Sequence, residues 1–476
     1  MVNWRWYYTT ETICQHQYGN LIFMKSTLGF YGGVGSVTGA NFLLDTGKLA
    51  ILVDCGLVQG EKFAPEINAV PFVYDPTNID VLLVTHAHAD HIGRIAKLVK
   101  DGFAGVIYST APTMALANVM LRDALKVMAY EHERYGNEML YDATDVDAAL
   151  ELWKAVDYHE TVTFSDDVSF YYSDAGHILG SGMVHLTRGE RTIVFTGDIG
   201  NVPQPLLSAP EIPKDYDYLV MESVYGDRLH EQVAERTALL AHYIEQTQKK
   251  NGTLIIPAFS LERTQGMLFE INNLIESGTL LTIPVFLDSP LAIAVTDIYR
   301  QFTHYLSPVI QKQISDGDDI FDFSGLSFTR TMKESHEIES VKGAKIIIAG
   351  SGMSHGGRIR YHEQTYLGDA NATVLLVGYQ AAGSLGRLLQ DGAKKVTIDG
   401  QLIRLRAEIA QIQGYSGHAD RDQLIHLVSE GCNKAKQIFV TMGEERSSLF
   451  LTQRLRDYLG APAIVPNLND EVEIDF

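Results

Sequence analysis

The sequence predicts an α/β protein in which one α/β unit is inserted into another, and three observations support this fold class. From Leu21 to about Ile199, short strand-like runs such as NFLLDTG, DVLLVTH and TIVFTGD mostly end in Gly, Asp or His. From about Tyr218, strands and helices alternate regularly, which is typical of βαβ units on a parallel sheet with covered faces. No low-complexity linker separates the blocks, which favours an insertion.

The elements follow in order along the chain. Residues 1–20 are expected to form a poorly ordered leader, or translation begins at Met24, because strand-like patterning starts only near Leu21. Helical spacing over Ala111–Ala155 predicts one or two helices. The first unit is then expected to comprise residues 21–220 and 405–476, and the inserted unit residues 221–404. The strands predicted within the inserted unit or at its border are YLVMES, TLIIPAF, IPVFLD, AKIIIAG and ATVLLVGY.

Composition limits the class of protein. The 476 residues exceed one ordinary core, and 46% hydrophobic with 20% charged residues is typical of globular domains. A net charge of −21 argues against a broad basic surface for nucleic acid, although a local basic groove stays open. The three cysteines, Cys14, Cys55 and Cys432, lack metal or disulfide spacing, and no run approaches a membrane span. We therefore expect a cytoplasmic protein without a membrane association.

The strongest chemical signal is the run His86-Ala-His88-Ala-Asp90-His91, which directly follows the apolar residues Val81–Val84. A strand that ends there would project several side chains into one loop. Neutral imidazole and carboxylate are the ligands that zinc takes in catalytic sites. The alternative is a polar surface loop with chance histidines, but four potential ligands within six residues favour a metal site.

Three further residues follow strand-like runs. His177 in DAGHILGSG and Asp198 in FTGDIG are candidate ligands, and each is flanked by glycines that permit close backbone approach. Taken alone, either residue is more often a turn residue or a helix cap. Asp54 in LAILVDCG could accept the free N–H of a ligating histidine, or it could only end its strand. Beside the histidine cluster, the functional interpretation is favoured.

These residues, in this order, resemble the motifs of the metallo-β-lactamase superfamily. Glu222 in MESVYGDR and His418 in GYSGHAD are similar to two further motifs of its β-CASP branch, which cleaves nucleic acids. The branch includes bacterial and archaeal RNA-processing nucleases and the endonuclease that cuts pre-mRNA at its 3′ end. The similarity extends roughly from Leu21 to Tyr458. It implies an αββα metallo-β-lactamase sandwich with an inserted, Rossmann-like, parallel-sheet β-CASP domain.

The resemblance also implies roles for individual residues. His86, His88 and His177 would hold a first zinc ion, Asp90 and His91 a second, and Asp198 would bridge the two. Such a pair of metals shares a hydroxide that attacks phosphorus in line. His418 would then protonate the leaving oxygen while Glu222 orients it. Asp90 and Asp54 complete the residues that the resemblance places in catalysis.

One position departs from the family pattern. RNA-cleaving members usually carry a histidine that ligates the second zinc some twenty residues beyond the His418 motif, and Met442 stands at that place here. A thioether is a weak ligand for zinc, so we expect the second metal to be weakly held or absent. DNA-specific members also carry an apolar residue there, which leaves DNA open as a substrate.

A glycine-rich segment in the expected inserted domain is a candidate phosphate site. The strand AKIIIAG is followed by SGMSHGGR and a predicted helix over Ile359–Gln364, and such turns present backbone N–H groups and a positive helix end. Taken without its context, the segment is more typical of an ordinary βα turn. Its candidate substrate-binding residues, together with two arginines expected on helices, are Ser351, Ser354, Gly356, Gly357, Arg358, Arg263 and Arg387.

The leading hypothesis is therefore a zinc-dependent nuclease, with one or two zinc ions per chain, that cleaves single-stranded RNA held between its two domains. The alternatives are a DNA nuclease, a hydrolase of small esters, lactones or thioesters with the same fold, and a weakly active RNA-binding scaffold. A homodimer is left open by the sequence. The roughly 180-residue insertion argues against a small-molecule hydrolase, and the otherwise complete ligand set argues against a scaffold.

Overall fold

Two seven-stranded sheets pack face to face and form the sandwich of the molecule. The computed structural model describes residues 25–60, 63–164, 167–230, 233–378, 380, 383–412 and 414–476. The expected leader over residues 1–20 and the alternative start at Met24 lie outside these residues. One sheet has the order β22-β1-β2-β3-β4-β5-β6, with bounds Glu471–Asp475, Lys25–Gly32, Asn41–Asp45, Ala50–Val53, Val81–Leu83, Val106–Ser109 and Trp153–Ala155.

The second sheet has the order β21-β20-β11-β10-β9-β8-β7. Its strands are Ala463–Ile464, Gln437–Val440, Tyr218–Met221, Arg191–Phe195, Gly182–Arg188, Val168–Asp174 and Val162–Thr163. The core between the two sheets follows from the period of two in the strands: Val81 and Leu83 face the other sheet, whereas Leu82 faces the outer helices. Alternate apolar residues therefore build two cores from one strand.

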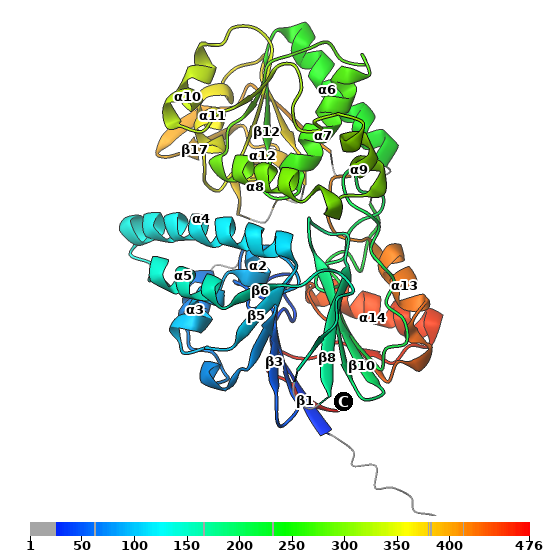
Figure 1. The fold of residues 1–476 in the computed structure, drawn as a ribbon. Coiled ribbons are helices and arrows are strands. Elements are labelled where there is room, and N and C mark those ends of the chain that lie inside the picture. Colours follow the sequence, from blue (N-terminus) through cyan, green and yellow to red (C-terminus); the bar gives the residue numbers. More distant parts are fainter. Residues whose placement is uncertain are drawn as a thin grey trace, which may run out of the picture.

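Helices cover the outer face of each sheet (Figure 1). The first sheet is covered by α2 (Ala89–Ile92), α3 (Ile95–Lys100), α4 (Ala111–Tyr135) and α5 (Ala143–Glu151), and the second by α13 (Arg421–Ser429) and α14 (Glu445–Leu459). A short helix, α1 (Ala64–Ala69), follows β3. The order helix, sheet, sheet, helix confirms the expected αββα sandwich. The range Ala111–Ala155, predicted to hold one or two helices, contains α4 and α5, and its last three residues form β6.

The inserted unit is a six-stranded sheet in which every neighbouring pair is parallel. Its order is β14-β13-β15-β12-β16-β19, with bounds Leu326–Phe328, Val285–Leu287, Lys345–Ala349, Thr253–Pro257, Thr373–Leu376 and Glu408–Gln411. This confirms the expected parallel α/β insertion. The edge strand β19 lies beyond the expected domain boundary at residue 404, so by its sheet pairing this unit extends to Gln411.

Helices cover both faces of the inserted sheet. One face packs against α6 (Val233–Lys250), α7 (Arg263–Glu276), α8 (Pro290–Gln301) and α9 (Pro308–Ser315). The other packs against α11 (Ile359–Tyr366), α12 (Leu385–Gln390) and the hairpin of β17 (Lys395–Ile398) and β18 (Gln401–Arg404), and α10 (Met332–Glu337) follows β14. Helix α4 of the sandwich lies below α8 of the insertion (Figure 1). Among the described residues, no helix combines the length and hydrophobicity needed to span a bilayer.

Candidate metal centre

The candidate ligands gather where strands of the two facing sheets end. His86 and His88 follow β4, and Asp90 and His91 lie on α2 directly after them. His177 follows β8 and Asp198 follows β10, and these two strands run in the same direction because each is antiparallel to β9. Strands that run in one direction present their carboxyl ends at one edge. The topology therefore brings the predicted ligands together from distant parts of the sequence.

The first group comprises His86, His88, His177 and Asp198, and its ligand atoms lie within 4.8 Å of one another. Nδ1 of His88 is 3.1 Å from Nε2 of His86 and 3.2 Å from Nε2 of His177. Oδ2 of Asp198 is 3.4 Å and 3.5 Å from the same two nitrogens. Ligands about 2.0–2.1 Å from a tetrahedral zinc ion lie about 3.3 Å apart. The four atoms therefore fit one tetrahedrally held ion.

The second group comprises Asp90, His91 and Asp198. Nε2 of His91 lies 3.3 Å from Oδ1 of Asp198 and 4.0 Å from Oδ2 of Asp90. Both Nε2 of His91 and Oδ1 of Asp198 are buried, and neither has a hydrogen-bond partner among the described residues. Buried polar atoms without partners are costly unless a ligand satisfies them. This pair of atoms therefore fits a second metal ion that shares Asp198 with the first.

The protonation of three of the four candidate histidines also suits metal binding. Burial lowers the pKa of His86, His88 and His177, and the neighbouring imidazoles lower it further. A metal binds only neutral imidazole, so these three rings are ready to act as ligands near neutral pH. Burial opposes the charged form of His91, but the carboxylates of Asp198 and Asp54 outweigh it and raise its pKa.

Asp54 lies behind the second group and holds it in place. Its Oδ2 lies 2.7 Å from Nδ1 of His91, which leaves Nε2 of that ring as the atom aimed at the metal. Both the backbone N–H and the hydroxyl of Thr85 donate to the same carboxylate, each at 2.8 Å. A Cβ at Gly56 would lie 1.5 Å from the carbonyl oxygen of Asp90, so only glycine lets the strand end approach α2 this closely.

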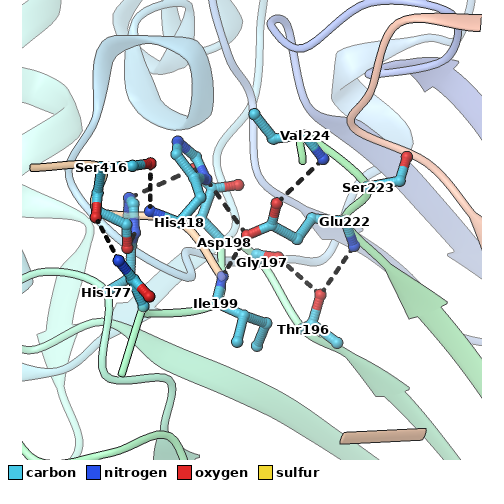
Figure 2. A network of polar contacts seen from close by, with 12 residues as sticks. His177, Thr196, Gly197, Asp198, Ile199, Glu222, Ser223, Val224, Ser416 and His418 are labelled. Atoms are coloured by element: carbon cyan, nitrogen blue, oxygen red, sulfur yellow. Dashed lines mark hydrogen bonds and ion pairs between the residues drawn. The ribbon is translucent and has the colours of Figure 1, made fainter. Parts of the chain in front are cut away.

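His418 and Glu222 lie beside the candidate ligands His177 and Asp198, as Figure 2 shows. Nδ1 of His418 is 3.3 Å from Oε1 of Glu222 and 3.9 Å from Oδ2 of Asp198. The backbone N–H groups of Ile199 and Val224 donate to the carboxylate of Glu222 at 2.6 and 3.2 Å. Burial opposes the imidazolium of His418, but Glu222 and Asp198 outweigh it and raise the pKa of His418 to about 9. An oriented, proton-bearing imidazole thus lies at the edge of the centre.

A backbone carbonyl joins this histidine to the first ligand group. The carbonyl oxygen of Gly417 accepts hydrogen bonds from Nδ1 of His177 at 3.0 Å, from the N–H of Asn201 at 3.0 Å and from Nε2 of Gln204 at 3.2 Å. Because Nδ1 of His177 donates there, its Nε2 is free to face the metal. The segment that carries His418 therefore also sets the orientation of a candidate metal ligand.

Two helices of the inserted unit hold that segment. Arg236 on α6 pairs with Glu270 on α7 at 2.5 Å, and it donates to the carbonyl of Gly414 at 2.9 Å. The hydroxyl of Tyr415 donates to the other oxygen of Glu270 at 2.6 Å, and the guanidinium of Arg236 lies 4.5 Å from the Tyr415 ring centre. All three side chains are buried. This network ties the return of the chain from the insertion to the helices of the insertion.

Met442 lies in the hydrophobic core between the sheets. It packs in the cluster that includes Phe42, Phe195 and Val220, and a Cβ at Gly33 would lie 2.3 Å from its sulfur. Met442 also lines a small cavity together with Asp54, His91 and Glu222. The methionine at the departure from the family pattern is therefore a packing residue close to the residues behind the second ligand group.

The glycine-rich segment after β15 forms a closed loop. The hydroxyl of Ser351 accepts the backbone N–H groups of His355 and Gly356 at 3.0 and 3.3 Å, and Ser354 is buried with its hydroxyl on Glu363. A Cβ at Gly356 would meet no other atom within 4 Å, whereas one at Gly357 would clash with the carbonyl of Gly350. The contribution of these residues to substrate binding stays a prediction.

The three arginines predicted to contact phosphate each have protein partners. Arg358 donates to Asp288 at 2.6 Å and to the carbonyls of Thr329 and Arg330. Arg263 is buried and donates to the carbonyl of Val377 and to Glu262, and Arg387 pairs with Asp391 at 3.0 Å on the surface. Of these three arginines, Arg387 has the most exposed side chain, at 43%.

Sequence reasoning missed three contributors to the site. Thr85 fixes Asp54, the carbonyl of Gly417 fixes His177, and Glu262 lies against the same turn. A backbone carbonyl has no signature in the sequence. Thr85 stands between the apolar strand and the histidine cluster, and a threonine at that place is also typical of an ordinary strand end. Glu262 stands next to Arg263 in SLERTQ, but its charge alone did not distinguish it from a surface helix residue.

Comparison with known proteins covers most of the chain. Residues 43–214 match the model of the metallo-beta-lactamase superfamily domain, residues 264–389 that of the Beta-Casp domain, and residues 402–466 that of the Zn-dependent metallo-hydrolase RNA specificity domain. In solved structures, the fold is similar to that of a protein of unknown function from Enterococcus faecalis, with TM-score 0.54 and 11% identity over 94% of this chain and 100% of the other.

Relatives of similar length are also found. A ribonuclease of Thermus thermophilus is 34% identical over 89% of this chain and 95% of its own length. An RNase J-like protein of Methanocaldococcus jannaschii is 31% identical over 92% of this chain and 97% of its own. A transcription termination factor of Methanosarcina mazei is 31% identical over 88% and 67%, respectively. With the metal-ligand geometry above, these matches show that the chain is a metal-dependent hydrolase and belongs to the β-CASP branch of the metallo-β-lactamase superfamily.

Proposed function

We propose that this protein is a nuclease that hydrolyses phosphodiester bonds of single-stranded RNA. The observation that carries the proposal is the meeting of two ligand groups on Asp198, with the pair of His418 and Glu222 beside them. Two metal positions that share a carboxylate suit a phosphodiester, which exposes an attacked phosphorus and a leaving oxygen at the same time. The ribonuclease and the RNase J-like protein among the relatives support RNA as the substrate.

The metal in this proposal is zinc, with one or two ions per chain. The nitrogen-rich donor set of the first group suits zinc, and its ligand separations suit tetrahedral coordination. The second group offers one imidazole and two carboxylates among the described residues, so it should hold its ion less tightly. Bound metal would supply a water of lowered pKa and a positive charge near the phosphate. A cytoplasmic location and a homodimer stay predictions.

The residues of the chain have distinct tasks in this reaction. Water adds its oxygen to phosphorus, the bond from phosphorus to the leaving oxygen breaks, and that oxygen must gain a proton. Glu222 accepts the N–H at Nδ1 of His418, so the proton at Nε2 is the one directed to the leaving oxygen. Asp54 and the carbonyl of Gly417 hold the rings of His91 and His177 with their free nitrogens towards the metals.

A small-molecule hydrolase is the second candidate, and the fold alone does not exclude it. The arrangement of His418 argues against it, because its position depends on the inserted unit through Arg236, Glu270 and Tyr415. A small ester would not need a domain of this size beside the proton donor. A DNA nuclease and an RNA-binding scaffold are separated from the proposal by the experiment below.

The test is cleavage of an end-labelled single-stranded RNA by the zinc-loaded protein, with DNA of the same sequence and the His88→Ala protein as controls. We expect RNA products that disappear with His88→Ala, and much slower cleavage of DNA. Equal cleavage of DNA would reassign the substrate. Bound zinc without cleavage of either nucleic acid would overturn the proposal, and Met442→His would then show whether one missing ligand is responsible.

A further inference from the structure

Glu262 adopts a rare backbone conformation at the border of the candidate centre. It precedes α7 with φ 66° and ψ −60°, and the N–H of Arg263 donates to the carbonyl of Leu261 at 2.9 Å across it. These features define a classic γ-turn, which is strained for any residue other than glycine. Strained backbone of this kind persists only where its surroundings hold it, and it gathers at ligand-binding and catalytic sites.

The strained turn aims the carboxylate at the segment that carries His418. A Cβ at Gly417 would lie 3.6 Å from Oε2 of Glu262 and 3.3 Å from Cε1 of His177. Glu262 and a metal ligand thus flank the same backbone point, one residue before the proton donor. Glu262 also lines a cavity together with Ser416, Arg263 and Asn201. The carboxylate therefore faces the side of the centre from which His418 acts.

One oxygen of this carboxylate is left for a ligand. Nε of Arg263 donates to Oε2 at 3.4 Å, whereas Oε1 accepts no hydrogen bond within the part of the chain that the structure describes. The side chain is 16% exposed, so part of it is accessible from the surface. Burial raises the pKa of this carboxyl group, whereas Arg263 and Arg236 favour its ionised form. When ionised, the carboxylate only accepts hydrogen bonds, and it repels phosphate. Its partner on a nucleic acid must therefore be a donor next to the backbone.

In RNA, that donor is the ribose 2′-hydroxyl. It lies on the carbon next to the one that bears the 3′ oxygen, so it neighbours the proton donor when the 3′ oxygen leaves. The 2′-hydroxyl is also the group by which proteins distinguish RNA from DNA. Amino groups of bases are donors too, but they lie farther from the scissile phosphate and would produce a sequence preference instead.

We propose that Glu262 is a specificity-determining residue that accepts a hydrogen bond from the 2′-hydroxyl of the ribose carrying the leaving oxygen. This inference rests on the proposed nuclease function and adds the residue by which the centre would select RNA. Nothing in the ligand groups themselves distinguishes the two nucleic acids, because a metal and an imidazole act on the phosphodiester that both share.

The test uses RNA oligonucleotides with one mapped cleavage site and a single 2′-deoxy or 2′-fluoro ribose on either side of it. The 2′-fluoro group occupies similar space but donates no hydrogen bond. For the wild type, either change on the ribose that carries the leaving oxygen should lower kcat/KM about 10- to 100-fold, the range for a hydrogen bond to a charged group. The same changes on the other ribose should have little effect.

Glu262→Gly is the decisive variant because glycine adopts this backbone without strain, so folding should be preserved. It should cleave all-ribose RNA about 10- to 100-fold more slowly than the wild type, and the deoxy substitution should then cost nothing more. Glu276→Gln, on the exposed end of the same helix, is the control and should keep the full discrimination of the wild type.

Undiminished discrimination by Glu262→Gly would overturn the inference, as would a change that follows the identity of the base. If the wild type cleaves no RNA, the nuclease proposal fails separately. Binding of the same oligonucleotides, measured by fluorescence anisotropy, then decides the inference. Weaker binding of the deoxy RNA by the wild type but not by Glu262→Gly would support it, and equal ratios would refute it.

Discussion

Two buried aspartates that follow strands, Asp198 in the sandwich and Asp288 in the inserted domain, have opposite surroundings. Asp288 accepts hydrogen bonds from Arg358, Thr329, Ser335 and His362, at 2.5–2.6 Å. Burial opposes its charge, but these donors outweigh it and hold its pKa at about 2. Asp198 faces several imidazoles, yet its Oδ1 has no hydrogen-bond partner among the described residues.

The difference shows how a structural carboxylate can be told from a functional one. Both residues lie next to histidines in the structure. In the sequence they cannot be told apart, because each is an aspartate that follows an apolar run. Asp288 has its acceptor capacity filled by protein donors, so it stabilises the loop that follows β15. Asp198 keeps unused acceptor capacity in a buried place, next to the imidazoles of the two candidate ligand groups, where a bound ion would satisfy it.

The largest effects are expected at the ligand cluster itself. His88→Ala should lose both metal and activity, because Nδ1 of His88 lies at the middle of the first group. His418→Ala should lower kcat about 10²- to 10⁴-fold while metal content stays unchanged, since its role is proton transfer. Metal analysis and single-turnover cleavage check both. Equal metal loss in the two variants would contradict the general-acid role.

Asp288→Asn tests whether Asp288 has a structural role. Removing the charge leaves Arg358 without its buried partner, so the free energy of unfolding should fall by about 3–5 kcal/mol, with metal content unchanged. Asp198→Asn should instead abolish the gain in Tm that zinc gives the wild type. Asp391→Asn, which breaks an exposed pair with Arg387, should change little. A zinc-dependent loss in Asp288→Asn would refute the structural role.

The buried carboxyl group of Glu363 is intermediate between Asp288 and Asp198, because only one of its two oxygens accepts a hydrogen bond within the described part of the chain. Ser354 donates to one of its oxygens, and the other has no partner among the described residues. Burial raises its pKa from 4.5 to about 8. A carboxyl group whose folded pKa is raised stabilises the protein below the unfolded pKa, and this stability is lost as pH rises towards the folded pKa.

Wild-type stability should therefore decline between about pH 4.5 and 8 through this residue, on the order of 3–5 kcal/mol in total. Glu363→Gln removes the ionisation, so the decline should flatten and the variant should be more stable than the wild type at pH 8. Urea unfolding at pH 5 and pH 8 measures both. A parallel decline in the two proteins would show that Glu363 does not carry it.

The smallest effect is expected at Met442. Met442→His should raise the affinity for a second zinc ion by about tenfold or more, because an imidazole would join the residues behind that group. It should also cost about 1–3 kcal/mol of stability, since a polar ring enters the cluster with Phe42 and Phe195. Met442→Leu is the packing control and should leave zinc stoichiometry unchanged. No difference in zinc binding between the two variants would exclude a ligand role.

The candidate ligands were predictable because they come after apolar strands, and the carboxyl ends of strands running in one direction meet at one edge. The spacing of His86, His88, Asp90 and His91 was sufficient to predict a metal site without any contact information. The arginines were less predictable. A sequence shows that Arg358 follows glycines, but it does not show that Asp288, seventy positions away, already occupies its guanidinium.

The sequence by itself determined the alternation of strands and helices in the insertion and the residues that can bind metal, because hydrophobic period and ligand chemistry are local properties of the chain. The sandwich followed from the resemblance of the motifs to the metallo-β-lactamase superfamily. Only the tertiary structure decided which nitrogen of His177 faces the metal, which carboxylates are already satisfied, and where Glu262 points. Those outcomes depend on donors and carbonyls from distant segments, and a hydrogen bond between distant segments exists only once the chain has folded.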